Sequence, residues 1–429
     1  MSDSSPSYRR GAAVLSVGIG LTGLITFGYF ALASHSLSPD EYGRISLLWS
    51  AIFITVSVLY RPVEQLLART IADRDERGLG GADHLRVAAT IQLALGVLFA
   101  LAALILRAPL EDDLFDGSAT LYWILLVAVL AYAASYFARG FLAGHHRFGL
   151  YGGLVLMEAS SRCLFALAVA VGIAEGQSAV ALGMAAAPIV SLALVPWALG
   201  RRLRAAPPPA DDGADPPPAE GVEFTLAHGS GFASAVLVIM LCEQTFLNAG
   251  PLLVRATEGE QGAALAGFTF NVLLIARAPL QLFQAVQASI LPHLTRLRAG
   301  GESDPFRRSV NLTLAAIAGF AACVALALLA AGPLAMELLF GDEFEYERGG
   351  LVLVAIGMGL YLAAATLNQA LLAHGRAPQA AASWALAAAA FVLFLLLAKL
   401  DDRVLQVELA FLGAAACLCA ALYTLYRRA

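Results

Sequence analysis

The stretch Arg201–Glu223 reads RRLRAAPPPADDGADPPPAEGVE and falls almost at the midpoint of the 429-residue chain. It contains two proline triplets and scattered acidic residues. Because proline removes backbone donors and blocks helix formation, we expect an extended, solvated linker here. Long apolar runs dominate the chain on both sides. We therefore predict an N-terminal half over residues 1–204, a cytoplasmic linker over 205–223 and a C-terminal half over 224–429.

The composition indicates a membrane protein. The hydrophobic fraction is 59%, the charged fraction 14% and the mean hydropathy +0.74, whereas soluble domains carry roughly a quarter of charged residues. Apolar runs of about 18 residues or more are transmembrane helix candidates. We predict an all-α polytopic membrane protein with twelve spans, six in each half. The predicted spans are 11–33, 44–67, 86–106, 119–139, 150–173, 178–200, 228–254, 262–291, 309–331, 350–372, 377–398 and 405–426.

The placement of basic residues supports this count independently. With both chain termini in the cytoplasm, 19 of the 27 basic residues fall in cytoplasmic segments and 6 on the opposite side. Two arginines remain inside predicted spans. Such an excess on one side sets the orientation of polytopic membrane proteins. We therefore expect a multi-pass protein of the cytoplasmic membrane with both termini inside.

The two halves also repeat short patterns at equivalent helices. The turn Arg139–Arg147 (RGFLAGHHR) resembles Asn368–Arg376 (NQALLAHGR), and both follow the fourth span of their half. The second span of each half carries an arginine shortly before a proline, in Arg61–Gln65 (RPVEQ) and Arg277–Gln281 (RAPLQ). Duplicated halves are common in transporters, where the substrate site lies between them. We therefore expect a central cavity between the halves.

Three motifs resemble those of a known family. The turn Leu37–Gly43 (LSPDEYG) after the first span looks like the L-S-P-x-x-Y-G turn of bacterial polysaccharide and O-antigen flippases. Leu291–Leu297 (LPHLTRL) and Leu371–Arg376 (LLAHGR) are looser matches. These flippases belong to the multidrug/oligosaccharidyl-lipid/polysaccharide exporter superfamily. The resemblance implies a MATE-like fold of two six-helix bundles around a central cavity. It also implies flipping of polyprenyl-diphosphate-linked sugars.

Two arginines lie near the middle of predicted spans, Arg162 in the fifth and Arg277 in the eighth. A charged group at mid-bilayer costs from about 3 kcal/mol upward, so such groups usually face the protein interior or a wet cavity. Guanidinium binds phosphate oxygens in a bidentate way and stays charged. We predict that both arginines bind a diphosphate headgroup. The alternative for Arg162 is neutralisation by Glu158, one helical turn earlier.

Further polar residues extend the predicted substrate site. The apolar run of the second span is too short to cross the bilayer without Arg61 and Glu64. Its helix should therefore draw both residues into the inner leaflet. The alternative for Arg61 is snorkelling to the cytoplasm. Gln281 shares a helix face with Arg277. On the seventh span, Gln244 and Asn248 share a face beside Glu243. The substrate-binding candidates are thus Arg277, Arg162, Arg61, Glu64, Gln281, Gln244 and Asn248.

Two carboxylates are candidates for ion coupling or for counter-ions. Glu243 could carry H⁺ or bind Na⁺, or it could pair with an arginine such as Arg277. Glu158 is the other candidate. We expect no cofactor and no metal site, because the five cysteines lie in apolar runs without a C-x-x-C pattern. No P-loop, G-x-G-x-x-G or nucleophile motif occurs either, which argues against ATP hydrolysis and against an enzyme.

The function that these features favour is a flippase for a polyprenyl-diphosphate-linked oligosaccharide, working by alternating access in envelope or exopolysaccharide biosynthesis. Its partners would be the lipid-linked oligosaccharide, membrane lipids and polysaccharide polymerase or glycosyltransferase proteins; the net charge of −5 disfavours nucleic acid. One alternative is a cation-coupled multidrug antiporter of the same superfamily, whose site should be acidic. Another is a membrane-embedded glycan ligase or glycosyltransferase, which should carry a large outer loop with acids or histidines.

Overall fold

The computed structural model describes residues 6–76, 78, 82–193, 226–259, 262–275, 277, 303–398 and 400–428. Within these ranges every regular element is a helix. The N-terminal half contains α1 (Pro6–Ser36), α2 (Pro39–Leu59), α3 (Arg61–Glu76), α4 (Asp83–Ile105), the short π-helix η1 (Pro109–Leu114), α5 (Ala119–Gly144), α6 (Phe148–Ala170) and α7 (Gly176–Leu192). The C-terminal half contains α9 (Leu226–Glu258), α11 (Ser303–Phe340), α12 (Arg348–Ala373), α13 (Ala377–Leu397) and α14 (Arg403–Arg427).

Each of the twelve predicted spans overlaps a helix of the described chain, while residues 194–200 of the sixth span and 276 and 278–291 of the eighth lie outside the described residues. Nine helices in the described ranges are long and apolar enough to cross a membrane, and α2 with α3 counts as one such span, Pro39–Asp75. Two shorter apolar helices, Gly176–Leu192 and Gly262–Ile275, fall on the sixth and eighth predicted spans. The predicted linker 205–223 lies outside the described residues. The all-α membrane fold expected from the sequence is therefore confirmed.

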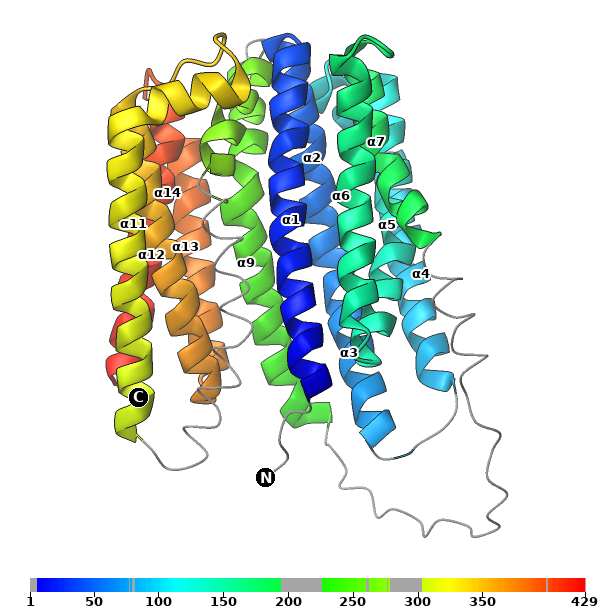
Figure 1. Ribbon diagram of the computed structural model, residues 1–429, viewed down its shortest axis with the longest axis vertical. Coiled ribbons are helices and arrows are strands. Elements are labelled where there is room, and N and C mark those ends of the chain that lie inside the picture. The colour runs from blue at the N-terminus through cyan, green and yellow to red at the C-terminus, as the bar shows by residue number, and fades with distance from the viewer. Residues whose placement is uncertain are drawn as a thin grey trace.

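The helices form two groups (Figure 1). In the N-terminal half, α6 packs against α1 and α7, while α5 packs against α3 and α7. In the C-terminal half, α12 packs against α11 and α14, while α13 packs against α9 and α14. The two groups meet where α2 packs against α9. The start of α1 and the end of α14 lie at the same end of the bundle (Figure 1), as an even number of spans requires.

The second span bends between α2 and α3 at Tyr60. Pro62 has no N–H to donate to Val58 one turn back, so the helical ladder is interrupted there. The chain nevertheless continues as helix, because Glu64 N–H donates to the Tyr60 carbonyl at 2.9 Å. The continuation confirms the expectation that this helix extends beyond the apolar run Ile45–Tyr60. It places Arg61 at the first turn of α3.

The L-S-P-x-x-Y-G turn has a local and a long-range role. Ser38 caps α2 in a capping box with Glu41, and Pro39 occupies the first helical turn, where its missing N–H costs nothing. Tyr42 and Gly43 follow on the first turns of α2 and reach the C-terminal half. The Tyr42 hydroxyl donates to Asn271 Oδ1, and a Cβ added at Gly43 would overlap the backbone carbonyl of Ala263.

These contacts form a dry seam between the halves at this end of the bundle. Tyr42 and Asn271 are fully buried. The Phe30 and Phe270 rings lie 4.6 Å apart, and the Tyr42 ring lies 5.2 Å from that of Phe344. Because Gly43 has no side chain, the backbones of α2 and of helix Gly262–Ile275 approach one another closely. We call these contacts of Phe30, Tyr42 and Gly43 with the C-terminal half the outer seam, after the side assigned from charge placement.

The repeat between the halves is visible in backbone geometry. At the end of α5, Arg147 N–H donates to the Leu142 carbonyl at 2.8 Å; at the end of α12, Arg376 N–H donates to the Leu371 carbonyl at 2.9 Å. The residue before each arginine has positive φ, +53° at His146 and +72° at Gly375. Both turns are therefore the helix-terminating motif in which an N–H bonds the carbonyl five residues back through one left-handed residue. The sequence similarity between these turns reflects a shared structure.

We expect Gly43→Ala to lower the free energy of unfolding by about 1–3 kcal/mol, the usual cost of forcing extra atoms into a packed contact. Thermal unfolding of the purified protein in detergent would measure the change. The matched control is Gly413→Ala in α14, where no atom lies within 4 Å of an added Cβ; it should be neutral or stabilising, since alanine favours helix. Equal effects of the two substitutions would contradict the close approach of the halves at Gly43.

Candidate substrate site

Arg277 is a buried cation held by amide side chains. It follows helix Gly262–Ile275 and is 8% exposed. Its Nη2 donates to Asn248 Oδ1 at 3.0 Å, and Asn248 Nδ2 donates in turn to Gln244 Oε1 at 3.0 Å. Both amides project from one face of α9, four residues apart. The structure thus brings three predicted substrate-binding residues into one hydrogen-bonded chain.

The guanidinium of Arg277 has no acidic partner. None of the ion pairs within the described ranges includes it, and its Nε is buried without a hydrogen-bond partner. Its Cζ lies 5.5 Å from the centre of the Phe270 ring, a favourable position for a cation against an aromatic face. The alternative in which Glu243 pairs with Arg277 is not seen within the described residues, where the side-chain hydrogen-bond partner of Arg277 is Asn248. The Arg277 guanidinium therefore keeps its positive charge and, among the described residues, its Nε–H is free to donate a hydrogen bond.

Arg61 of α3 and Glu243 of α9 come from opposite halves, and Glu243 directly precedes Gln244, which is linked to Arg277 through Asn248. The side chains of both are half-buried, so both reach accessible space. The charges of Arg61 and Glu243 act on one another. Both charges, together with that of Arg277, also act on the Tyr361 hydroxyl of α12. Residues from α3, α9 and α12 thus share one electrostatic neighbourhood, and we call Arg61, Glu243, Arg277 and Tyr361 the inner charge cluster.

Arg162 lies in an aromatic cage inside the N-terminal half. It is 4% exposed, and its Nη1 donates to the Tyr132 hydroxyl at 2.6 Å. Its Cζ lies 5.0 Å from the Trp49 ring centre and 5.6 Å from that of Phe53. The alternative of neutralisation by Glu158 is wrong, because that carboxylate turns to another arginine. Arg162 is therefore stabilised by ring faces in place of a counter-ion.

Glu158 belongs to a buried ion pair with Arg139, which the sequence analysis did not anticipate. Glu158 is 2% exposed in its side chain and Arg139 12%. Glu158 also accepts hydrogen bonds from Ser135 and, at 3.3 Å, from Ser191. The carboxylate is saturated by groups from α5 and α7, so its role in this structure is that of a counter-ion.

The side chain of Glu64 is also buried inside the N-terminal half. It is 8% exposed, and it accepts a hydrogen bond of 2.9 Å from the Tyr151 hydroxyl of α6. Arg139 and Arg61 both act on its charge. Glu64 thus connects the buried ion pair of Arg139 and Glu158 to Arg61 of the inner charge cluster. The neighbouring Gln65 is exposed. The predicted site residue Gln281 lies outside the described residues.

Sequence reasoning missed Arg139, Tyr132 and Tyr361. A signal for Arg139 was present: it lies four residues after Ser135 on the face of α5 that also carries Tyr132 and Tyr136. The sequence analysis assigned Arg139 to a cytoplasmic turn and so missed this position, whereas α5 continues to Gly144 and includes Arg139. No local pattern distinguishes Tyr132 and Tyr361 from ordinary helix-packing residues, because their partners come from other helices.

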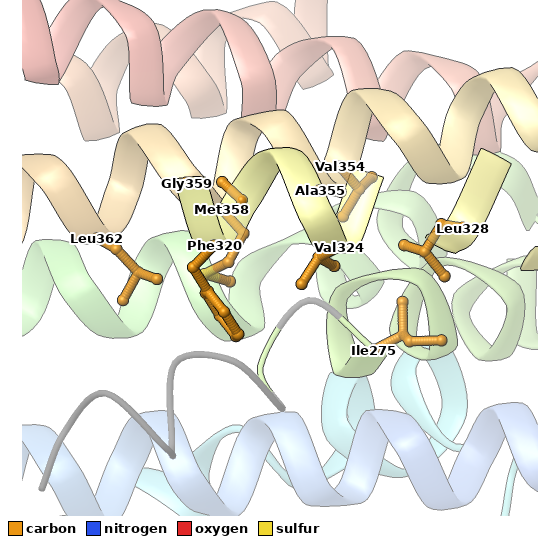
Figure 2. Close-up of a pocket in the computed structure, with 10 residues that line it drawn as sticks. Ile275, Phe320, Val324, Leu328, Val354, Ala355, Met358, Gly359 and Leu362 are labelled. Atoms are coloured by element: carbon orange, nitrogen blue, oxygen red, sulfur yellow. The ribbon is translucent and has the colours of Figure 1, made fainter. Parts of the chain in front are cut away.

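Two hollows in the described surface lack charge. A cavity of about 10 Å³, room for about one water, lies between α11, α12 and Ile275, and Figure 2 shows Phe320, Val324 and Met358 among its apolar walls. A larger groove of about 650 Å³ lies along α4 and α5, with Gln92 as its polar residue. Neither offers a partner for an ionic headgroup, so the inner charge cluster is the candidate site.

We expect Glu158→Gln to lower the free energy of unfolding by about 3–5 kcal/mol, because it leaves the Arg139 guanidinium buried without a counter-ion. Thermal unfolding in detergent would measure the loss. Replacing both partners with leucine should recover most of it, since a buried pair is often equalled by apolar side chains. If the double leucine variant is as unstable as Glu158→Gln, the buried arginine left without its counter-ion is not the cause of the instability of Glu158→Gln.

Comparison of sequences finds distant relatives. No protein-family model matches the chain. An uncharacterised protein of Mycobacterium tuberculosis is 26% identical over 371 residues, which cover 82% of this chain and 78% of the relative. An uncharacterised protein of Mycobacterium bovis matches to the same extent. These similarities span both halves of the chain.

Comparison of structures is more informative about the fold. A variant of the Vibrio cholerae MATE transporter VcmN matches with a TM-score of 0.63 and 16% identity, over 98% of this chain and 97% of that one. An inward-facing multidrug resistance MATE family transporter of the MOP superfamily matches with 0.68 and 12%, over 97% of each chain. The eukaryotic MATE transporter AtDTX14 matches with 0.63 and 13%, over 99% and 97%. The chain therefore has the fold of the MATE transporters, twelve helices in two halves.

Proposed function

We propose that this protein is a membrane transporter of the MATE fold that flips a polyprenyl-diphosphate-linked oligosaccharide across the cytoplasmic membrane. The observation that carries the proposal is Arg277, a buried guanidinium with an amide partner, Asn248, an Nε–H without a hydrogen-bond partner, and no counter-ion among the described residues. A charge kept in such a place is expensive, and a diphosphate would repay the cost through charge-assisted bidentate bonds. The proposed role of Arg277 is to hold the anionic headgroup.

The neighbours of Arg277 suit a polar cargo. Gln244 and Asn248 offer amide groups for the sugar or the phosphate oxygens, next to the guanidinium. Arg61 is half-buried on the opposite half and would attract the headgroup to the space between the halves. The polyprenyl tail would stay in the lipid. Two phosphate charges would then cross the low-dielectric region beside two positive side chains, which lowers the cost of transfer.

The proposed location is the cytoplasmic membrane with both termini inside, from the distribution of basic residues. The cargo is made in the cytoplasm and polymerised outside. Polysaccharide polymerase and glycosyltransferase proteins are therefore the proposed functional partners. Translocation would proceed by alternating access, in which the two halves rock about the seam where α2 meets α9.

We expect Arg277→Ala to reduce translocation of the lipid-linked oligosaccharide about tenfold to a hundredfold, because one charge-assisted contact contributes about 1.5–3 kcal/mol. The assay follows a labelled polyprenyl-diphosphate oligosaccharide in proteoliposomes. Arg277→Lys should recover part of the rate, since lysine keeps the charge and loses the bidentate fork. Arg348→Ala, an exposed arginine at the start of α12, is the control. Translocation unaffected by Arg277→Ala would contradict the proposal.

A cation-coupled multidrug antiporter is the second candidate. One of the solved structures with this fold is named as a multidrug resistance transporter, and Glu243 is a half-buried carboxylate that an organic cation or a coupling H⁺ or Na⁺ would suit. The charge balance argues against it. Arg61 and Arg277 outnumber Glu243 in the inner charge cluster, so a cationic drug would meet net repulsion.

Efflux of a cationic dye from proteoliposomes under a proton or sodium gradient separates the two candidates. We expect no gradient-driven efflux above that of protein-free vesicles. Dye efflux that is driven by the gradient and abolished by Glu243→Gln would contradict the flippase and support the antiporter. Arg277→Ala, which removes a positive charge from the site, would then raise dye transport.

A further inference from the structure

A carboxyl group lies buried between α12 and α14 near the outer side. Glu408 of α14 is 4% exposed. Among the described residues it has neither an ion pair nor a hydrogen-bond donor. The basic residues nearby are engaged elsewhere, since Arg403 pairs with Glu258 at 2.6 Å and Arg255 pairs with Asp116. Buried carboxylates are normally paired or hydrogen-bonded, so this one requires a different explanation.

The packing of α12 makes room for this carboxyl group. Gly350 lies in the first turn of α12, and a Cβ there would coincide with the carboxyl group of Glu408. Seven residues further along α12, a Cβ at Gly357 would lie 2.9 Å from the Phe411 ring. Glu408 and Phe411 are three residues apart, and both project from α14 onto glycines of α12. The carboxyl group is therefore part of the interface between the two helices.

The charges that act on Glu408 are negative. They belong to Asp402, the N-cap of α14, and to Glu347, the N-cap of α12. The amino end of α12 would favour a negative charge, but Glu347 already occupies that end. Arg348 beside it is exposed, and α13 carries no charged residue. Ionisation would place an unpaired buried charge beside two like charges, so a carboxyl group in this setting keeps its proton.

The segment before α12 connects this carboxyl group to the outer seam. The ring centre of Phe344 lies 5.2 Å from that of Tyr42 in the N-terminal half. Two residues later, the Tyr346 hydroxyl donates to the Phe268 carbonyl at 3.1 Å. The first turn of α12 follows directly. Separation of the halves at the outer seam would therefore displace the part of α12 that covers the carboxyl group, and water would reach it.

We propose that Glu408 is a proton-binding site, which holds its proton while the outer seam is closed and exchanges it with the outside when the seam opens. On opening, the O–H bond breaks, the carboxylate keeps the electron pair and outer water accepts the proton. The ionised form needs water, so it favours the open seam, and the protonated form favours the closed one. The inference rests on the alternating access of the proposed function and assigns its coupling ion as H⁺.

Infrared spectroscopy of the full-length protein in lipid nanodiscs tests the proton directly, because a protonated carboxyl group absorbs apart from a carboxylate. At neutral pH the spectrum should contain a protonated-carboxyl band that Glu408→Gln removes and Glu408→Asp shifts. The matched control is Glu337→Gln, at an exposed carboxylate of α11, which should leave that band unchanged. A spectrum that is the same in Glu408→Gln as in the unaltered protein would overturn the inference.

A distance between spin labels tests the link to the outer seam. The five native cysteines are replaced, and labels are placed at exposed Ser178 and Ala256, on the outer side of opposite halves. Raising the pH above neutrality removes the proton, so the longer distance should gain population, by at most about tenfold in ratio per pH unit for one proton. Glu408→Gln should keep the short distance at every pH, whereas Glu337→Gln should retain the pH dependence.

Two outcomes of the distance measurement would refute the proposal. One is a pH dependence that persists unchanged in Glu408→Gln. The other is a response to Na⁺ at constant pH that Glu408→Gln abolishes, which would make this a site for a metal cation.

Gly350→Ala tests the geometry of the site independently. Its methyl group would displace the carboxyl group, so the midpoint of thermal unfolding should fall. In a Glu408→Ala background the space is free, and the same change should lower the midpoint much less. Equal losses in the two backgrounds would contradict the contact between Gly350 and Glu408.

The infrared and distance measurements need neither cargo nor transport. A band and distances that behave as expected, in a protein that does not move lipid-linked oligosaccharide, would uphold the proton site and refute the flippase. Translocation that depends on Arg277, in a protein whose spectrum ignores Glu408→Gln, would uphold the flippase and refute the proton site.

Discussion

A guanidinium inside a membrane must be surrounded by groups that replace the water it has lost. The described chain does this in three ways. Arg139 uses a carboxylate, Glu158; Arg162 uses ring faces and a tyrosine hydroxyl; Arg277 uses an amide. A carboxylate neutralises the charge, whereas rings and amides leave it in place. The choice of partner therefore decides which arginine is structural and which remains available to an anion.

The outer seam explains why a short turn carries the resemblance to the flippases. In Leu37–Gly43 the serine and proline start α2, and the tyrosine and glycine fasten it to the C-terminal half. Each residue type has a separate structural role. Ser38 caps the helix and Pro39 takes a first-turn position that needs no N–H donor. Tyr42 supplies a buried hydroxyl, and Gly43 allows the close backbone approach.

The same seam gives the inner charge cluster its setting. Tight packing at one end fixes how α2 and α9 meet, and the bend after α2 carries Arg61 toward the other half. The amide of Asn248 gives Arg277 a hydrogen-bond partner without neutralising its charge. The fold itself, shared with proteins at 12–16% identity, leaves the cargo to these side chains.

The sequence by itself determined the class of the protein, the approximate positions of its apolar helices, and their grouping into two halves. These follow from local and additive properties: apolar length, the side bias of arginine, and turn residues such as those of Asn368–Arg376. It also singled out Arg277, Gln244 and Asn248, because polar residues in an apolar run stand out without knowledge of their neighbours.

Only the tertiary structure decided which charges meet. Glu158 lies one turn before Arg162, yet it pairs with Arg139, whose distance along the chain gave no hint of contact. Among the ion pairs of the described residues, none joins Glu243 to Arg277. An ion pair between helices depends on their packing angle and rotation, and these are fixed by contacts such as Gly43 against Ala263, which helical periodicity within one segment does not encode.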